Sequence, residues 1–195
     1  AFYVQQGNFK DAEPMYLKAL SIMEMSLIAN NPNKATGLNN LAALYRKQGK
    51  YSEADPLYRR SVKIAEATLG PDHPNLAAIY FNLASFYRNQ GNDKQEELLY
   101  KKALKIREKA LDPNHPDLAI NLHCLGVLYC KRGQYKEAEP ILKRSLAIGE
   151  KAFGVNHPYI AISLDQYSSL LRNTNRKVEA RKFEARAKAI RAIKR

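Results

Sequence analysis

The stretch Gly-Gln-Tyr-Lys-Glu-Ala-Glu-Pro at residues 133–140 decides the fold of this chain, because related copies of it recur along the sequence. Residues 49–56 read Gly-Lys-Tyr-Ser-Glu-Ala-Asp-Pro, and residues 7–14 read Gly-Asn-Phe-Lys-Asp-Ala-Glu-Pro. The copy at residues 91–98 has diverged to Gly-Asn-Asp-Lys-Gln-Glu-Glu-Leu. The glycines that open the copies stand at equal intervals, at positions 7, 49, 91 and 133, and a fixed period of this size indicates a repeat protein.

A second set of landmarks keeps the same period. Prolines stand at positions 32, 74, 116 and 158, the last three of them directly after a histidine, and Asn175 falls where the next glycine is expected. Two independent sets in one register define a truncated unit at residues 1–30 and complete units near 31–72, 73–114, 115–156 and 157–195. Because a single unit cannot bury its apolar face alone, we expect one solenoid domain over residues 1–195.

Each unit contains two helical patterns. In the second complete unit, Leu76, Ile79 and Leu83 recur at steps of three and four residues, which is one face of a helix. Pro74 suits a first helical turn, and Gly91 suits the positive φ at which that helix ends. The sequence therefore predicts an all-α fold with first helices near 33–48, 75–90, 117–132 and 159–173, and second helices near 9–28, 51–68, 93–110, 135–152 and 177–194.

Three prolines conflict locally with this assignment. Pro14, Pro56 and Pro140 fall a few residues inside predicted second helices, where a proline removes one backbone hydrogen bond and bends the helix. Their shared register indicates that the fold tolerates the bend.

The pattern within each unit resembles the tetratricopeptide repeat. One unit reads Leu41-Ala42, Tyr45, Gly49, Tyr51, Ala54, Tyr58 and Ser61, and another reads Leu125-Gly126, Tyr129, Gly133, Tyr135, Ala138, Leu142 and Ser145. The usual repeat has about 34 residues. The longer period of this chain is similar to the repeats of kinesin light chains and of related bacterial arrays. The resemblance implies a right-handed superhelix of stacked hairpins, with Ala54 and Ala138 buried at helix crossings.

The resemblance also implies a site. In the family the first helices line a concave groove that binds a peptide segment of another protein, and kinesin light chains bind acidic peptides with an aromatic anchor. We therefore expect a non-catalytic scaffold or adaptor, although the same side chains could form an ordinary solvated face. Carried over by register, the groove residues are Asn39, Asn40, Arg46, Lys47, Phe81, Asn82, Arg88, Asn89, His123, Lys131, Arg172 and Asn173.

The distribution of charge suggests a second hypothesis. The formal net charge is +13, and the residues from Leu171 to Arg195 hold ten basic and two acidic side chains. Clustered positive charge is the electrostatic signature of a nucleic-acid-binding surface. The alternative function is therefore nucleic-acid binding through the basic C-terminal helix. A basic groove would favour the acidic peptide instead.

No pattern in the sequence indicates catalysis, a cofactor or a metal. His73, His115 and His157 are one repeat apart, which is too far for shared zinc coordination, so we expect them to cap turns. His123, Cys124 and Cys130 share one predicted helix but point in different directions, and no further ligand is evident. Phosphate-binding loops and nucleophile motifs are also missing, so we expect no small-molecule substrate.

The remaining predictions concern the surroundings of the protein. Two cysteines do not make a disulfide framework, and no apolar run approaches the length of about 20 residues that spans a membrane. We expect a soluble, cytoplasmic protein whose partner is another protein. Since Tyr3 aligns with Tyr45, residue 1 corresponds to the middle of a first helix, and we expect the chain to be part of a longer protein.

Overall fold

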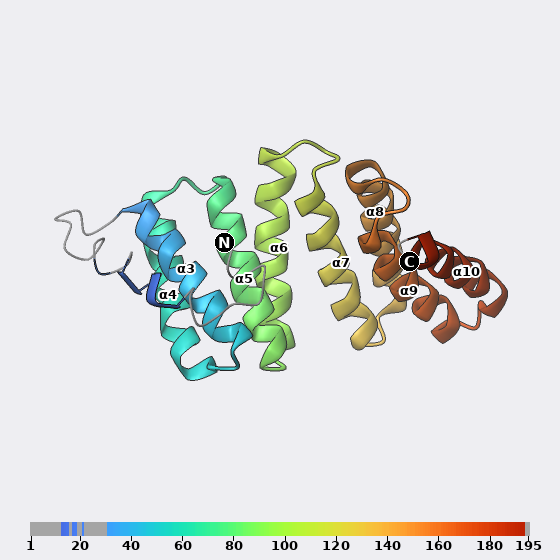
Figure 1. The fold of residues 1–195 in the computed structure, drawn as a ribbon, viewed down its shortest axis with the longest axis horizontal. Helices are drawn as coiled ribbons and strands as arrows, with labels where there is room; N and C mark the ends of the chain where they lie inside the picture. The colour runs from blue at the N-terminus through green and yellow to red at the C-terminus, as the bar shows by residue number, and fades with distance from the viewer. Residues whose placement is uncertain (1–12, 16, 19–20, 22–30, 194–195) are drawn as a thin grey trace. The chain divides into compact units, whose positions relative to one another are not determined.

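The computed structural model describes residues 13–15, 17–18, 21 and 31–193, and within these residues all regular structure is helical. Most of the predicted truncated unit and of the helix near 9–28 lies outside the described residues. The helices pair as antiparallel hairpins (Figure 1) and run as α3 (Pro32–Lys47), α4 (Tyr51–Thr68), α5 (Pro74–Asn89), α6 (Asp93–Ala110), α7 (Pro116–Lys131), α8 (Tyr135–Phe153), α9 (Pro158–Asn173) and α10 (Lys177–Ile193). The predicted all-α fold is confirmed, and the predicted helix positions over residues 31–193 are confirmed to within one or two residues.

The histidines before the prolines cap the first helices, as predicted. The backbone N–H of Asn75 donates to Nδ1 of His73 over 3.1 Å, and His115 and His157 accept from the N–H two residues ahead at the same distance. Pro74 then occupies the first turn of α5, where a missing N–H costs no hydrogen bond. The repeated His-Pro pair is thus a helix start signal.

The glycines end these helices in a left-handed conformation. Gly49, Gly91 and Gly133 have φ values of 77°, 70° and 73°. Asn175 takes their place after α9 with a φ of 62°, which an asparagine side chain tolerates better than most. The predicted reversal of the chain at these positions is confirmed.

The interior prolines do not interrupt their helices. Pro56 lies inside α4 and Pro140 lies inside α8. Each proline removes the hydrogen bond to the carbonyl four residues earlier, which belongs to Ser52 or Lys136. Both of these residues are exposed, so water can satisfy the carbonyl and the helix continues.

The chain divides into two compact units, residues 1–106 and 107–195, which we describe separately. In the first unit, the Ser61 hydroxyl donates to the carbonyl of Ala35 over 2.7 Å where α4 crosses α3. In the second unit, Ser145 donates to Ala119 over 2.8 Å where α8 crosses α7. The single solenoid domain over residues 1–195 stays a prediction.

Small side chains allow the helices of a hairpin to approach closely. Ala54 and Ala138 are both 0% exposed, which confirms their predicted burial. Opposite α8, a Cβ atom added to Gly126 would lie 2.6 Å from a methyl group of Leu142. The α7–α8 crossing is therefore packed too closely for a larger side chain at position 126 or 138.

Replacement of Ala138 by leucine tests this packing. We expect Ala138→Leu to lower the free energy of unfolding by about 1–3 kcal/mol, because extra methylenes in a filled core force neighbouring side chains out of their rotamers. Ala189→Leu is the matched control, since Ala189 is exposed on α10. Urea denaturation measures both variants, and equal stabilities would contradict the assigned crossing.

Candidate functional site

Three predicted asparagines of the first unit form one amide chain. Asn82 of α5 donates its Nδ2 to Oδ1 of Asn39 on α3 over 3.2 Å, and Asn39 donates to Oδ1 of Asn40 over 3.4 Å. Asn39 is only 4% exposed, whereas Asn40 and Asn82 are half-buried. A side-chain amide has two donors and an acceptor with two lone pairs, so the two outer members retain capacity to bind a peptide backbone.

The predicted cations of the first unit differ in access. Arg46 is half-buried with a fully buried Nε, and its guanidinium lies close enough to the Tyr58 hydroxyl to oppose the rise that burial causes in the pKa of that tyrosine. Lys47 and Arg88 are exposed at the last turns of α3 and α5. Asn89 is also exposed and donates to the Tyr51 hydroxyl over 3.5 Å. Lys47 and Arg88 are therefore the more accessible cations for an incoming carboxylate.

The two predicted ring-bearing residues take part in packing. Phe81 lies against the Tyr100 ring of α6 at a centroid distance of 5.3 Å. His123 lies edge-on to Tyr159 of α9 at 5.9 Å. Both are half-buried, so each offers only part of its surface to a ligand.

In the second unit, the predicted polar residues lie on α7 and α9, and one of them is tied to another helix. Lys131 and Asn173 are exposed. Arg172 makes a bidentate pair with Glu184 of α10, with nitrogen–oxygen distances of 2.5 and 2.8 Å, and this carboxylate raises the pKa of Arg172. Because Glu184 already balances its charge, Arg172 attracts a further carboxylate less than its formal charge suggests.

Ion pairs also neutralise part of the basic C-terminal segment. Arg186 contacts Glu150 over 2.5 Å, and Arg191 contacts Asp165. With Arg172 and Arg176, at least four of the ten basic side chains carry a carboxylate partner. The positive charge on α10 is thus less continuous than the sequence suggests.

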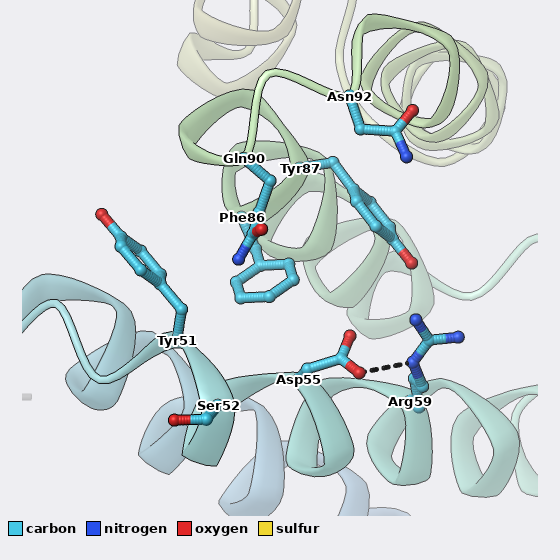
Figure 2. Close-up of a pocket in the computed structure, with 8 residues that line it drawn as sticks. All are labelled: Tyr51, Ser52, Asp55, Arg59, Phe86, Tyr87, Gln90 and Asn92. Atoms are coloured by element: carbon cyan, nitrogen blue, oxygen red, sulfur yellow. Dashed lines mark hydrogen bonds and ion pairs between the residues drawn. The ribbon is translucent and has the colours of Figure 1, made fainter.

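The structure reveals a pocket that lies outside the predicted groove residues. It has a volume of about 410 Å³ and lies in the first unit, between the N-terminal half of α4 and the C-terminal end of α5 (Figure 2). The rings of Phe86 and Tyr87 face an ion pair in which Arg59 donates to Oδ2 of Asp55 over 2.8 Å. The lining residues are Tyr51, Ser52, Asp55, Arg59, Phe86, Tyr87, Gln90 and Asn92.

The equivalent place in the second unit, two repeats further along the chain, is filled by an ion network around Glu139. Lys143 donates to this carboxylate over 2.8 Å, Arg176 reaches both of its oxygens over 2.8 and 2.9 Å, and Tyr167 donates over 3.0 Å. Hydrogen bonds from Lys143 and then from Arg176 lower the pKa of Glu139 to about 2. The two units thus carry an open and a filled version of one site.

The repeat register holds the signal that could have found this pocket. Aspartate and arginine at 55 and 59 correspond to Glu139 and Lys143, but Asn92 corresponds to Arg176. Asparagine is several bonds shorter than arginine, so the first unit lacks the side chain that fills the second.

Among the described residues, no group of three or more histidine, cysteine or acidic side chains is arranged to hold a metal ion. Cys124 is buried and Cys130 is half-buried, and burial raises the pKa of the Cys130 thiol. A raised thiol pKa reduces the thiolate fraction that nucleophilic chemistry requires. In the described part of the chain, none of the helices combines the length and apolarity needed to cross a membrane.

The fold and its polar faces define a class of α-helical repeat scaffolds. Comparison with protein families matches the tetratricopeptide repeat to residues 1–67, 35–109 and 117–192. The chain therefore belongs to the tetratricopeptide repeat family, as its resemblance predicted. Repeats of this family generally form non-catalytic scaffolds, and proteins built from them generally bind other proteins.

Solved structures include kinesin light chain-like relatives. A Podosopora anserina protein assigned to the kinesin light chains, with nearly identical TPR-like repeats, is 26% identical with a TM-score of 0.79 over 99% of this chain and 92% of that one. BtubC (BKLC) from P. vanneervenii is 24% identical, with a TM-score of 0.86 over 98% of this chain and 76% of that one. The apo form of RapI is 16% identical, with a TM-score of 0.81 over 97% of this chain and 66% of that one. A search of curated proteins found no match.

The Glu139 network predicts a pH-dependent contribution to stability. A carboxylate whose folded pKa lies below its ordinary value of about 4.3 stabilises the fold above that pH and loses this effect as the pH falls towards 2. We expect Glu139→Gln to lower the free energy of unfolding at pH 7 by about 1 kcal/mol, a value kept small because the side chain is 23% exposed and screened by solvent.

Urea denaturation of both proteins at pH 7, 4 and 3 measures this contribution. The difference in free energy of unfolding between wild type and Glu139→Gln should become smaller at pH 4 and smaller again at pH 3. Glu137→Gln, which alters an exposed carboxylate two residues away on the same helix, is the control. A difference that stays constant with pH would mean that the network does not stabilise the fold.

Proposed function

We propose that this protein is a non-catalytic adaptor that binds a peptide segment of a partner along the face formed by its first helices. The observation that carries the proposal is the row of polar side chains shared by α3 and α5. Asn39 and Asn82 are linked across the two helices, and Lys47 and Arg88 are exposed at the ends of the same helices. Amides that bind a peptide backbone and cations that bind carboxylates suit an acidic, extended segment.

An aromatic anchor in the ligand agrees with the composition of this face. Phe81, which precedes Asn82 in α5, is half-buried and already packs against Tyr100. An aromatic side chain of the ligand can add to this pair in an offset or edge-on arrangement. In the second unit, the exposed Lys131 and Asn173 on the first helices offer the same polar chemistry to a peptide.

Nucleic-acid binding through α10 is the alternative function, and the structure supports it less well. Arg186 and Arg191 are paired with carboxylates of the protein, and a phosphate would have to displace them. Lys182 and Lys188 are exposed on the same helix, where they are solvated and screened by salt within roughly 8 Å.

Matched charge removals test the groove. We expect Lys47→Gln combined with Arg88→Gln to weaken binding of an acidic peptide with a central tryptophan by about 1.5–3 kcal/mol, the range of hydrogen bonds to charged groups. Lys182→Gln combined with Lys188→Gln removes the same charge from α10 and should have a smaller, strongly salt-dependent effect. The chain contains no tryptophan, so fluorescence of the peptide reports binding directly.

The relative peptide affinities of the two double variants decide between peptide binding in the groove and binding through α10. A titration of each variant at two salt concentrations measures these affinities. If the α10 variant loses binding while the groove variant binds normally, the groove hypothesis is wrong and the basic helix is the functional surface.

A further inference from the structure

The open pocket of the first unit and the filled site of the second unit share one backbone framework. The N–H of Asn92 donates to the carbonyl of Tyr87 over 3.0 Å, and the N–H of Arg176 donates to the carbonyl of Leu171 over 2.8 Å. Each residue then accepts the first backbone hydrogen bond of the following helix, from Glu96 or Ala180. Positions 92 and 176 are therefore structurally equivalent, and their side chains start from the same point.

The second unit shows what this framework accommodates. There the Arg176 guanidinium directs one terminal nitrogen to Glu139, while its other nitrogens bind Glu179 in the first turn of α10 over 2.8 and 2.7 Å. In the first unit the equivalent residue is Asn92, and a pocket of about 410 Å³ lies beside it. We propose that this pocket binds the guanidinium of an arginine in a partner polypeptide, which takes the place that Arg176 holds in the second unit.

The walls of the pocket suit a planar cation. Asp55 bonds Arg59 through Oδ2, and its Oδ1 is turned towards the space beside Phe86 (Figure 2). Phe86 and Tyr87 stand where the second unit has Leu170 and Leu171. Phe86 is only 2% exposed, so the half-buried Tyr87 is the ring that a guanidinium can reach. A tyrosine ring attracts a cation electrostatically and stacks on a guanidinium, which a leucine side chain cannot do.

The neighbouring cation does not exclude the ligand. Arg59 occupies the position of Lys143, and Lys143 shares the Glu139 carboxylate with Arg176 in the second unit. Two cations around one carboxylate are therefore compatible with this framework.

One difference between the two sites specifies the ligand further. Position 95 is glutamine where the second unit has Glu179, so the pocket supplies one carboxylate and no second acid. The partner must supply the acid that balances the outer side of its arginine. Arg176 and Glu179 are three residues apart, and this spacing pairs the side chains on one helical turn. The ligand class is accordingly an arginine followed three residues later by a glutamate.

The probe for this site is the blocked peptide acetyl-Arg-Ala-Ala-Glu-amide, titrated into the ¹⁵N-labelled chain. Binding should shift the backbone amide signals of residues 86–92. A peptide with citrulline in place of arginine keeps the shape without the charge, and we expect it to bind at least about tenfold more weakly, as for the loss of one charged hydrogen bond. Asp55→Asn should weaken binding of the arginine peptide by a similar factor.

Two reciprocal variants separate pocket filling from damage to the fold. Asn92→Arg places the guanidinium of the second unit in the first and should abolish the shifts while leaving the helical content unchanged. Arg176→Asn opens the second unit and should produce new shifts near residues 170–176. These should saturate at higher peptide concentration than in the first unit, because Leu171 stands in place of the Tyr87 ring. If the citrulline peptide binds equally well, or if Asn92→Arg binds the arginine peptide like the wild type, the inference is overturned.

Discussion

The close approach of the two helices in the α3–α4 and α7–α8 hairpins is the constraint on which the other features depend. Ala138 is completely buried, and Gly126 faces Leu142 so closely that no Cβ atom fits. The hydroxyl of Ser145 then fixes the axial register by bonding a carbonyl of the facing helix. The repeats can carry different side chains at equivalent positions only because this crossing holds the backbone the same. A polar difference between repeats at an exposed position is therefore a difference in what the surface can bind.

Equivalent positions near the ends of second helices use that freedom to carry different residues. Positions 107 and 149 are equivalent, yet one holds arginine and the other glycine. Arg107 is 5% exposed and donates to the Asn121 side chain and the Asp117 carbonyl, each over 3.2 Å, so its buried charge has polar partners. At Gly149 a Cβ atom would lie 2.8 Å from the Tyr159 ring. An exchange of Arg107 and Gly149 would bury an arginine without these partners at position 149 and leave a void at position 107.

Local signals in the sequence predicted the fold well because they act within a few residues of where they are read. His73 caps the residue two positions later, and Gly91 reverses the chain at its own position. Charges were predicted less well, because their state depends on side chains that meet from different helices. Nothing near Arg172 in the sequence identifies Glu184 as its partner, and nothing near Arg46 indicates that its guanidinium lies beside Tyr58. The pocket beside Asp55 is harder still to predict from the sequence, because it exists only where the side chain at position 92 is too short to fill it.

Formal charge is consequently a poor measure of what this surface attracts. Much of the +13 lies near the C-terminus, but arginines there lie against carboxylates that cancel their field at short range. Lys47 and Arg88 contribute far less charge, yet they are exposed on the same first helices that carry amides already ordered by hydrogen bonds. Since a ligand gains most from groups that are accessible and already held in place, we expect geometry rather than total charge to decide where a charged ligand binds. The same reasoning applies with opposite sign to the Asp55 pocket, where a carboxylate and the half-buried Tyr87 ring suit a cation although the chain as a whole is strongly basic.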